Sequence, residues 1–176
     1  MNATKTDDLK TSRPKIKVPL EPLDIIVDLI SVTLLIFILG YTLMVYADLP
    51  DIIATHFNAQ GEADDFGSKL IIWLLPSIGL VMFVGLFYLN KFPHIHNYNV
   101  NITEGNALQN YRLSSRIVRF TNLFSLTLFA IITFDIIQLA KGFKTTILGS
   151  TFLIITLILP IIGVAIIIYS QKKINN

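Results

Sequence analysis

The chain contains no cysteine, which excludes disulfides, thiolate metal sites, cysteine nucleophiles and iron–sulfur clusters. Charged side chains are also scarce, because they make up only 15% of the 176 residues, whereas soluble domains carry about 25%. Hydrophobic residues account for 53% of the chain. Its length would suit one soluble domain, but this composition is typical of a membrane protein.

Four long apolar stretches account for the excess of hydrophobic residues. Residues 29–47, 70–90 and 145–171 contain no charged side chain, and residues 120–140 contain only Asp135. Each stretch is close to the ~20 residues that cross a hydrocarbon core. These stretches predict an all-α membrane bundle of four helices with a short structured loop outside. The helices are expected over about residues 25–47, 70–90, 117–140 and 146–169.

Basic residues predict how the bundle is oriented. Three of the 14 lysines and arginines, Lys69, Lys141 and Lys144, fall on the first and third loops. The other eleven lie on the two tails, on the second loop and at the start of the third helix: Lys5, Lys10, Arg13, Lys15, Lys17, Lys91, Arg112, Arg116, Arg119, Lys172 and Lys173. Because cytoplasmic segments are rich in lysine and arginine, we expect both termini in the cytoplasm and residues 48–69 outside.

The sequence predicts a flexible cytoplasmic tail over residues 1–22 and the four-span bundle over residues 23–176. The tail combines charged residues with Pro14, Pro19 and Pro22 and shows no apolar periodicity. A segment of this composition cannot bury a core. Its basic residues can still lie on anionic lipid headgroups.

An alternating pattern marks the second loop. Tyr98, Val100 and Ile102 are separated from one another by asparagines, so an extended segment would place all three on one face. Thr103 is a suitable N-cap, and a helix is expected to run from there to Ala140. Three basic residues near the start of this helix are expected to act as interfacial anchors: Arg112, Arg116 and Arg119.

Polar residues of the first loop form a candidate binding site. His56 and Asn58 are two residues apart, so an extended segment puts both on one face, and Gly61 permits a positive φ. Together with Asp64 and Asp65 they could converge on a cation or a ligand amine. They could equally form the loop's own hydrogen bonds, and the pattern leaves both interpretations open.

Asp135 is the only carboxylate well inside a predicted span, near its outer end. Ionisable groups within the membrane are costly and usually face a bundle interior or a wet cavity. One interpretation is that the carboxylate reaches the nearby membrane boundary. The other is that it pairs with Lys69 or His56 beneath the first loop and forms a small polar pocket.

The first loop also carries a longer motif: Pro50, His56-Phe57-Asn58, Gly61, then an aspartate and an aromatic residue before Gly67-Ser68-Lys69. This motif resembles the signature of a bacterial membrane domain of unknown function that is shared with the Sdp-type toxin immunity proteins. Residues 97–104 with Asn106, followed by Tyr111-Arg112, are similar to a later part of the same family. The resemblance covers roughly residues 25–120.

The resemblance implies an immunity-type integral protein of a bacterial cytoplasmic membrane. Such proteins protect a cell against a secreted membrane-active peptide toxin, and some also signal to a cytoplasmic repressor. The implied partners are the lipid bilayer, a peptide toxin and a cytoplasmic regulator. The chain departs from the family in having fewer spans, and in Ala54 and Asn99, where the family often has proline. The candidate ligand-binding residues are His56, Asn58, Gly61, Asp64, Lys69 and Asp135.

A different class of function also fits the sequence. Asp135, with an outer polar pocket around it and two proline-interrupted helices, would suit a small transporter or channel component that acts as a homo-oligomer. No Gly-x-Ser-x-Gly, His-Glu-x-x-His or Walker sequence occurs, so we expect neither an enzyme nor a cofactor. His94 and His96 are too few ligands for a metal site. Nucleic acid is not an expected direct partner.

Overall fold

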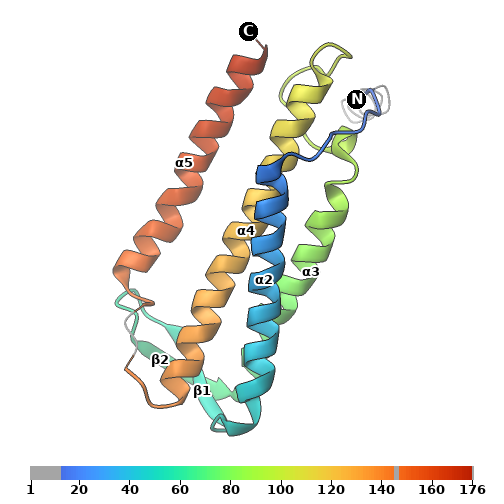
Figure 1. Cartoon of the computed structure of the whole chain (residues 1–176). Helices are drawn as coiled ribbons and strands as arrows, with labels where there is room; N and C mark the ends of the chain where they lie inside the picture. Colours follow the sequence, from blue (N-terminus) through green and yellow to red (C-terminus); the bar gives the residue numbers. More distant parts are fainter. Residues whose placement is uncertain (1–12, 145–146, 176) are drawn as a thin grey trace, which may run out of the picture.

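The structure is a computed structural model that describes residues 13–144 and 147–175 (Figure 1). Two strands, β1 (Ile52–Phe57) and β2 (Ala63–Ser68), follow the first described helix. Three short 3-10 turns lie at Tyr46–Asp48, Lys69–Trp73 and Pro93–Ile95. The long helices are α2 (Pro22–Val45), α3 (Leu74–Leu89), α4 (Ala107–Ala140) and α5 (Ser150–Asn175).

Each of these helices is long and apolar enough to cross a membrane. With adjoining 3-10 turns included, the four candidate spans within the described ranges are Pro22–Asp48, Lys69–Leu89, Ala107–Ala140 and Ser150–Asn175. Their number and positions confirm the four membrane helices predicted from hydropathy. The chain is therefore a multi-pass integral membrane protein.

The bundle has two ends of different chemistry. We call β1, β2, their flanking turns and residues 141–144 and 147–149 the hairpin end, and residues 13–21, 90–106 and Asn175 the terminal end. Figure 1 shows the start of α2 and the end of α5 at the terminal end, with the strands opposite. α2 and α4 both run toward the hairpin end, whereas α3 and α5 run back.

Helix α4 packs against both α2 and α3, so its face carries most of the core. Buried apolar residues form one cluster in the middle of the bundle, one at the hairpin end and one around Ile102 near the terminal end. The middle cluster contains Leu35, Ile38, Leu126 and Ala130. The cluster at the hairpin end contains Val45, Leu49, Ile53, Ile72 and Ile137. Helix α5 has no buried residue, so its sides are available to lipid or to another protein.

Strands β1 and β2 form an antiparallel hairpin that the all-α prediction did not include. Ile52 pairs with Ser68, and irregularities interrupt the register on either side of His56. β-Branched residues favour the extended backbone of β1, and Gly61 closes the turn with the expected positive φ of 83°. Ser68 caps the next helical turn by accepting a hydrogen bond from the amide of Leu70 at 3.4 Å.

The predicted flexible tail is held against the bundle over its described part. Arg13 donates hydrogen bonds to two carbonyl oxygens of the second loop, at 3.1 and 2.7 Å. Tyr111 donates to the carbonyl oxygen of Pro14 at 2.9 Å. These contacts correct the prediction of a free arm, because composition cannot reveal partners that lie far away in sequence. Residues 1–12 of the predicted tail lie outside the described residues.

The second loop agrees with its alternating pattern in packing but not in secondary structure. Tyr98 and Val100 pack against the buried cluster that contains Ile102, although this described stretch forms no β-strand. Thr103 is not the N-cap of α4. Asn106 takes that position, and its side-chain oxygen accepts a hydrogen bond from the amide of Thr103 at 2.9 Å.

Candidate functional site

Asn58 organises the turn of the hairpin. Its side-chain oxygen accepts hydrogen bonds from the amides of Gln60 and Glu62, at 2.9 and 3.0 Å. Its side-chain nitrogen donates to the Glu62 carboxylate at 3.0 Å. Such side-chain bonds to nearby backbone groups stabilise a turn. Asn58 therefore serves the loop's own structure.

His56 and Asp64 are paired across the two strands. Their closest atoms, Nδ1 and Oδ1, are 2.6 Å apart, and the side chains remain 67% and 44% exposed. Lys69 is turned away from this pair, because its ammonium group donates to the carbonyl oxygen of Leu49 at 3.0 Å and contacts Asp51 at 3.2 Å. The hairpin thus brings His56 and Asp64 together but leaves Lys69 at the base.

Asp135 lies fully inside the protein, with 1% of its surface exposed. Its Oδ2 accepts a hydrogen bond from the amide of Leu148 at 3.4 Å. Within the described residues it makes no ion pair with Lys69 or His56, so the pairing considered from the sequence is wrong. The carboxylate instead binds the backbone of the connection between α4 and α5.

Gly61 brings the turn of the hairpin to the same connection. A Cβ atom placed on Gly61 would lie 1.5 Å from the carbonyl oxygen of Leu148, so only glycine allows this close approach. Leu148 therefore contacts the turn through its carbonyl group and Asp135 through its amide. Gly61 and Asp135, which the sequence suggested for one site, are thus linked through the backbone of Leu148.

Further polar side chains are buried in α2 and α4 near Asp135, and we call Thr42, Thr133 and Asp135 the inner polar residues. In the described part of the chain, both threonine hydroxyls and Oδ1 of Asp135 are buried without a hydrogen-bond partner. The rings of the neighbouring residues Tyr41 and Phe134 stack at 5.8 Å, which places Thr42 and Thr133 at a similar depth in the bundle. Buried polar groups without partners cost free energy, so each of these atoms would be stabilised by a water molecule or another polar group.

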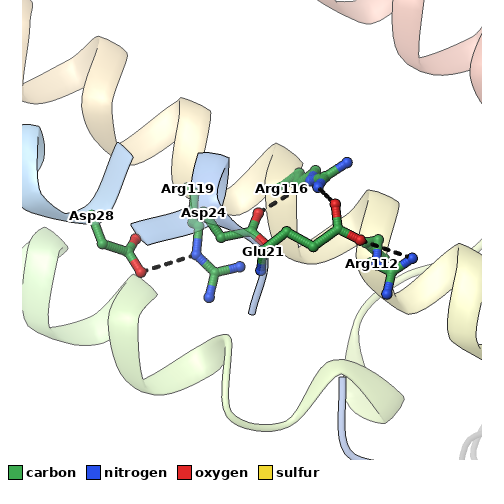
Figure 2. A network of polar contacts seen from close by, with 6 residues as sticks. All are labelled: Glu21, Asp24, Asp28, Arg112, Arg116 and Arg119. Atoms are coloured by element: carbon green, nitrogen blue, oxygen red, sulfur yellow. Dashed lines mark hydrogen bonds and ion pairs between the residues drawn. The ribbon is translucent and has the colours of Figure 1, made fainter. Parts of the chain in front are cut away.

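An ion-pair ladder joins α2 to α4 near the terminal end (Figure 2). Glu21 contacts Arg112 at 3.1 Å and also pairs with Arg116. The ladder continues from Arg116 to Asp24 at 3.1 Å. Its last pair joins Arg119 to Asp28 at 3.1 Å.

Spacing explains how the ladder forms. Residues three and four apart lie on one face of a helix, which applies to the three acids at the start of α2 and to the three arginines of α4. Because the two helices run in the same direction, the acids and arginines meet in the same order. The sequence predicted Arg112, Arg116 and Arg119 as interfacial anchors and overlooked their partners. The matched spacing of opposite charges was the available signal.

The second loop holds a buried histidine. His96 is 7% exposed, and its ring contacts the Ser114 hydroxyl at 2.7 Å and the carbonyl oxygen of Leu89 at 3.1 Å. Burial lowers the pKa of His96 below its ordinary value of 6.5, and the neighbouring His94 lowers it further, while the bond to Leu89 opposes the shift. His96 is therefore neutral at pH 7, with Nε2 as the donor to Leu89.

Comparison with known proteins gives two partial matches. Residues 33–80 match the model of a domain of unknown function, DUF1648, and this stretch contains the end of α2, the hairpin and the start of α3. An uncharacterized protein of Archaeoglobus fulgidus is 45% identical over 38 residues, which are 22% of this chain. The match spans about a fifth, 21%, of that archaeal protein's length. No solved structure matches the chain.

The domain model covers the part of the molecule that holds the candidate residues of the hairpin. The residues matched by the domain model include the whole hairpin, with His56, Asn58, Gly61 and Asp64. They end before the second loop and before α4. The chain is thus a multi-pass membrane protein with a stretch that is similar to a domain of unknown function.

Proposed function

We propose that the chain is an immunity-type membrane protein that recognises a secreted, membrane-active peptide toxin through its hairpin. In this proposal it lies in a bacterial cytoplasmic membrane with both termini in the cytoplasm, and it is not an enzyme. Residues 23–176 act as one membrane unit. The match to DUF1648 is compatible with the resemblance of the hairpin to Sdp-type immunity proteins, which motivates the proposal.

The surface of the hairpin is the observation that carries the proposal. Ile52 and Phe66 are apolar side chains that stay 61% and 59% exposed. They lie on the same small sheet as Asp64 and Asp65, whose carboxylates are also exposed. A combination of exposed apolar and acidic groups is suited to an amphipathic peptide with positive charge.

The hairpin is also firmly attached to the bundle. Ile53 of β1 is 2% exposed and packs in the apolar cluster at the hairpin end. At the other end of the hairpin, Gly61 abuts the backbone of Leu148. A recognition surface held at both ends loses little conformational entropy when a ligand binds.

Charge supports the proposed orientation. The terminal end and the adjoining turns of α4 and α5 carry nine of the twelve described basic residues, whereas acids predominate around the hairpin. Under the positive-inside rule the hairpin would face outward. A cysteine introduced at Gln60 is expected to react with an impermeant reagent added outside intact cells, and one at Asn99 is not. The opposite labelling would place the hairpin in the cytoplasm and remove the proposed route to a secreted toxin.

The functional test is protection of a toxin-sensitive bacterial host that expresses the chain and is challenged with candidate peptides. His56→Ala and Asp64→Ala are expected to abolish protection with little loss of folded protein, because this pair is largely exposed. Glu104→Ala, which removes an exposed acid at the terminal end, is the matched control. Full protection by both hairpin variants would overturn the proposal.

The inner polar residues favour a second candidate, a small transporter or channel component. Three buried oxygen atoms without partners in the described residues, on Thr42, Thr133 and Asp135, resemble the polar groups that line pathways through membranes. In this case α5, which has no buried residue, would pack against a second copy. The partner would be another protomer as well as the bilayer.

Asp135→Asn distinguishes the two candidates, because it keeps the shape of the side chain and removes its charge. Transport by the purified chain in lipid vesicles should then be lost, whereas protection against a peptide recognised by the hairpin should continue. Loss of protection without any conductance or uptake by the native chain would exclude transport and would assign Asp135 to the support of the hairpin.

A further inference from the structure

A cavity of ≈ 220 Å³ lies between α2, α3 and α4 beside the ion-pair ladder. A single ordered water needs only roughly 15 Å³, so this space can take a larger group. Its wall combines charged and polar side chains with exposed apolar ones. Those that carry the argument are Leu20, Phe87, Asn90, Lys91, Ser115 and Arg119.

The cavity wall contains hydrogen-bonding groups that have no partner among the described residues. Ser115 is 3% exposed, and its hydroxyl is buried without a hydrogen bond. Nε of Arg112 and the side-chain oxygen of Asn90 are also buried without a hydrogen bond. Two of these groups can donate and one accepts. A ligand with acceptor oxygens and at least one hydroxyl would satisfy all three.

The charge of the site favours an anion. The cavity wall contains three basic side chains, Lys91, Arg112 and Arg119, against two acidic ones, Asp24 and Asp28. Lys91 has no carboxylate partner in the described part of the chain, and its ammonium group lies 5.4 Å from the centre of the Phe87 ring. Figure 2 shows the terminal nitrogens of Arg119 directed away from Asp28, so they remain available as donors.

Apolar residues beside these groups point to a lipid as the source of the anion. Leu20 is 58% exposed and Phe87 is 48% exposed. Both side chains line the cavity, so they can contact the acyl chains of a bound lipid. The cavity also lies where α2 and α4 begin and α3 ends, which is headgroup level for spans of this length. Basic pockets between membrane helices at this level bind anionic headgroups.

We propose that this cavity binds the phosphate group of an anionic phospholipid, with phosphatidylglycerol as the best chemical fit. The phosphate oxygens accept hydrogen bonds from Ser115 and Arg112 and attract Lys91. A glycerol hydroxyl donates to the side-chain oxygen of Asn90. Asp24 and Asp28 do not repel this ligand strongly, because each is neutralised by an arginine of the ladder.

The test measures lipid binding to the full chain, purified in a neutral detergent, by native mass spectrometry. Phosphatidylglycerol, phosphatidylcholine with the same acyl chains, and inorganic phosphate are titrated separately. The native chain is expected to bind phosphatidylglycerol most tightly. Lys91→Gln should weaken this binding about fivefold, the effect expected for one basic residue near an anionic headgroup, and Ser115→Ala should weaken it as well.

Lys172→Gln is the matched control, because it removes a basic residue of the last turn of α5 that does not line the cavity. Circular dichroism confirms that each variant is folded. Equal affinity for the two phospholipids in the native chain would overturn the proposal, as would equal losses from Lys91→Gln and Lys172→Gln. Tight binding of inorganic phosphate without preference for phosphatidylglycerol would identify a free anion and exclude the lipid.

Discussion

The ion-pair ladder should be the main polar contribution to the packing of α2 on α4. The perturbation is a double-mutant cycle of Asp24→Asn and Arg116→Gln, which keep the approximate shape of each side chain. Asp24 has a side chain that is only 4% exposed, and its carboxylate lies 3.1 Å from Arg116. Removing one partner of such a pair leaves the other as an uncompensated buried charge.

The loss of stability depends on how deeply the pair is buried and on which contacts the remaining partner keeps. Loss of one partner of a buried ion pair costs about 3–5 kcal/mol. Arg116 retains its contact with Glu21 and is 28% exposed, so Asp24→Asn is expected at the lower limit, about 3 kcal/mol. The coupling between the two substitutions should be about 1–2 kcal/mol.

Unfolding of the full chain in mixed micelles can be followed through Trp73, the single tryptophan, whose ring centre lies 5.8 Å from that of Tyr46 at the hairpin end. A signal at the opposite end of the bundle from the substitutions reports on global unfolding. The pair Asp51 and Lys69 is the control, since its contact of 3.2 Å is similar but Asp51 is 93% exposed. Its coupling should be much smaller.

A coupling near zero for Asp24 and Arg116, or one no larger than that of the exposed pair, would refute the reasoning. It would mean that water or lipid headgroups solvate the charges of the ladder, and that apolar packing alone holds α2 against α4.

Two further perturbations test other parts of the structure. Gly61→Ala should release the turn of the hairpin from Leu148 and raise the hydrogen-exchange rate of the turn. Gly142→Ala is the control, because Gly142 has a similar φ of 85° but nothing within 4 Å, so this substitution should cause only the backbone strain of about 1–2 kcal/mol. Equal effects of the two substitutions would exclude the contact between Gly61 and Leu148. The lowered pKa of His96 means that the unfolded chain takes up a proton first, so stability should fall as the pH drops below about 6.5. His96→Asn should flatten this dependence relative to His94→Asn, and an unchanged slope would contradict it.

Hydropathy and length predicted the membrane helices well, because in a bilayer each helix must satisfy its own backbone and cover it with apolar side chains. The prediction that one helix continues from the second loop to Ala140 is confirmed by α4. Its start differed by a few residues, because Asn106 binds the amide of Thr103 and delays the first turn. Local alternatives of this kind are hard to rank from sequence.

The hairpin was harder to predict. β2 contains Ala63, Asp64, Asp65 and Gly67, which are poor strand formers. Its extended backbone depends on pairing with β1 and on the turn at Gly61, so the cause lies in neighbouring segments. The resemblance identified the motif without indicating its secondary structure.

Long-range polar partners were the least predictable feature. The sequence left open whether Asp135 reaches the membrane boundary or pairs with Lys69 or His56, but its partner in the structure is the backbone amide of Leu148, which any residue except proline could supply. The arginines of α4 looked like independent anchors, because their acidic partners lie in another helix. Which helices are neighbours, and in which direction they run, decides such pairings.

The ladder has a consequence for the synthesis of the protein. Asp24 and Arg116 are 92 residues apart in sequence, so at about 5–20 residues per second the ribosome needs roughly 5–20 seconds to supply the partner after the acid has emerged. During that interval α2 must wait at the translocon or in the bilayer with three unneutralised acids at its first turns. Their position at the very start of the helix allows them to stay in water, so the first span can insert before its partner exists.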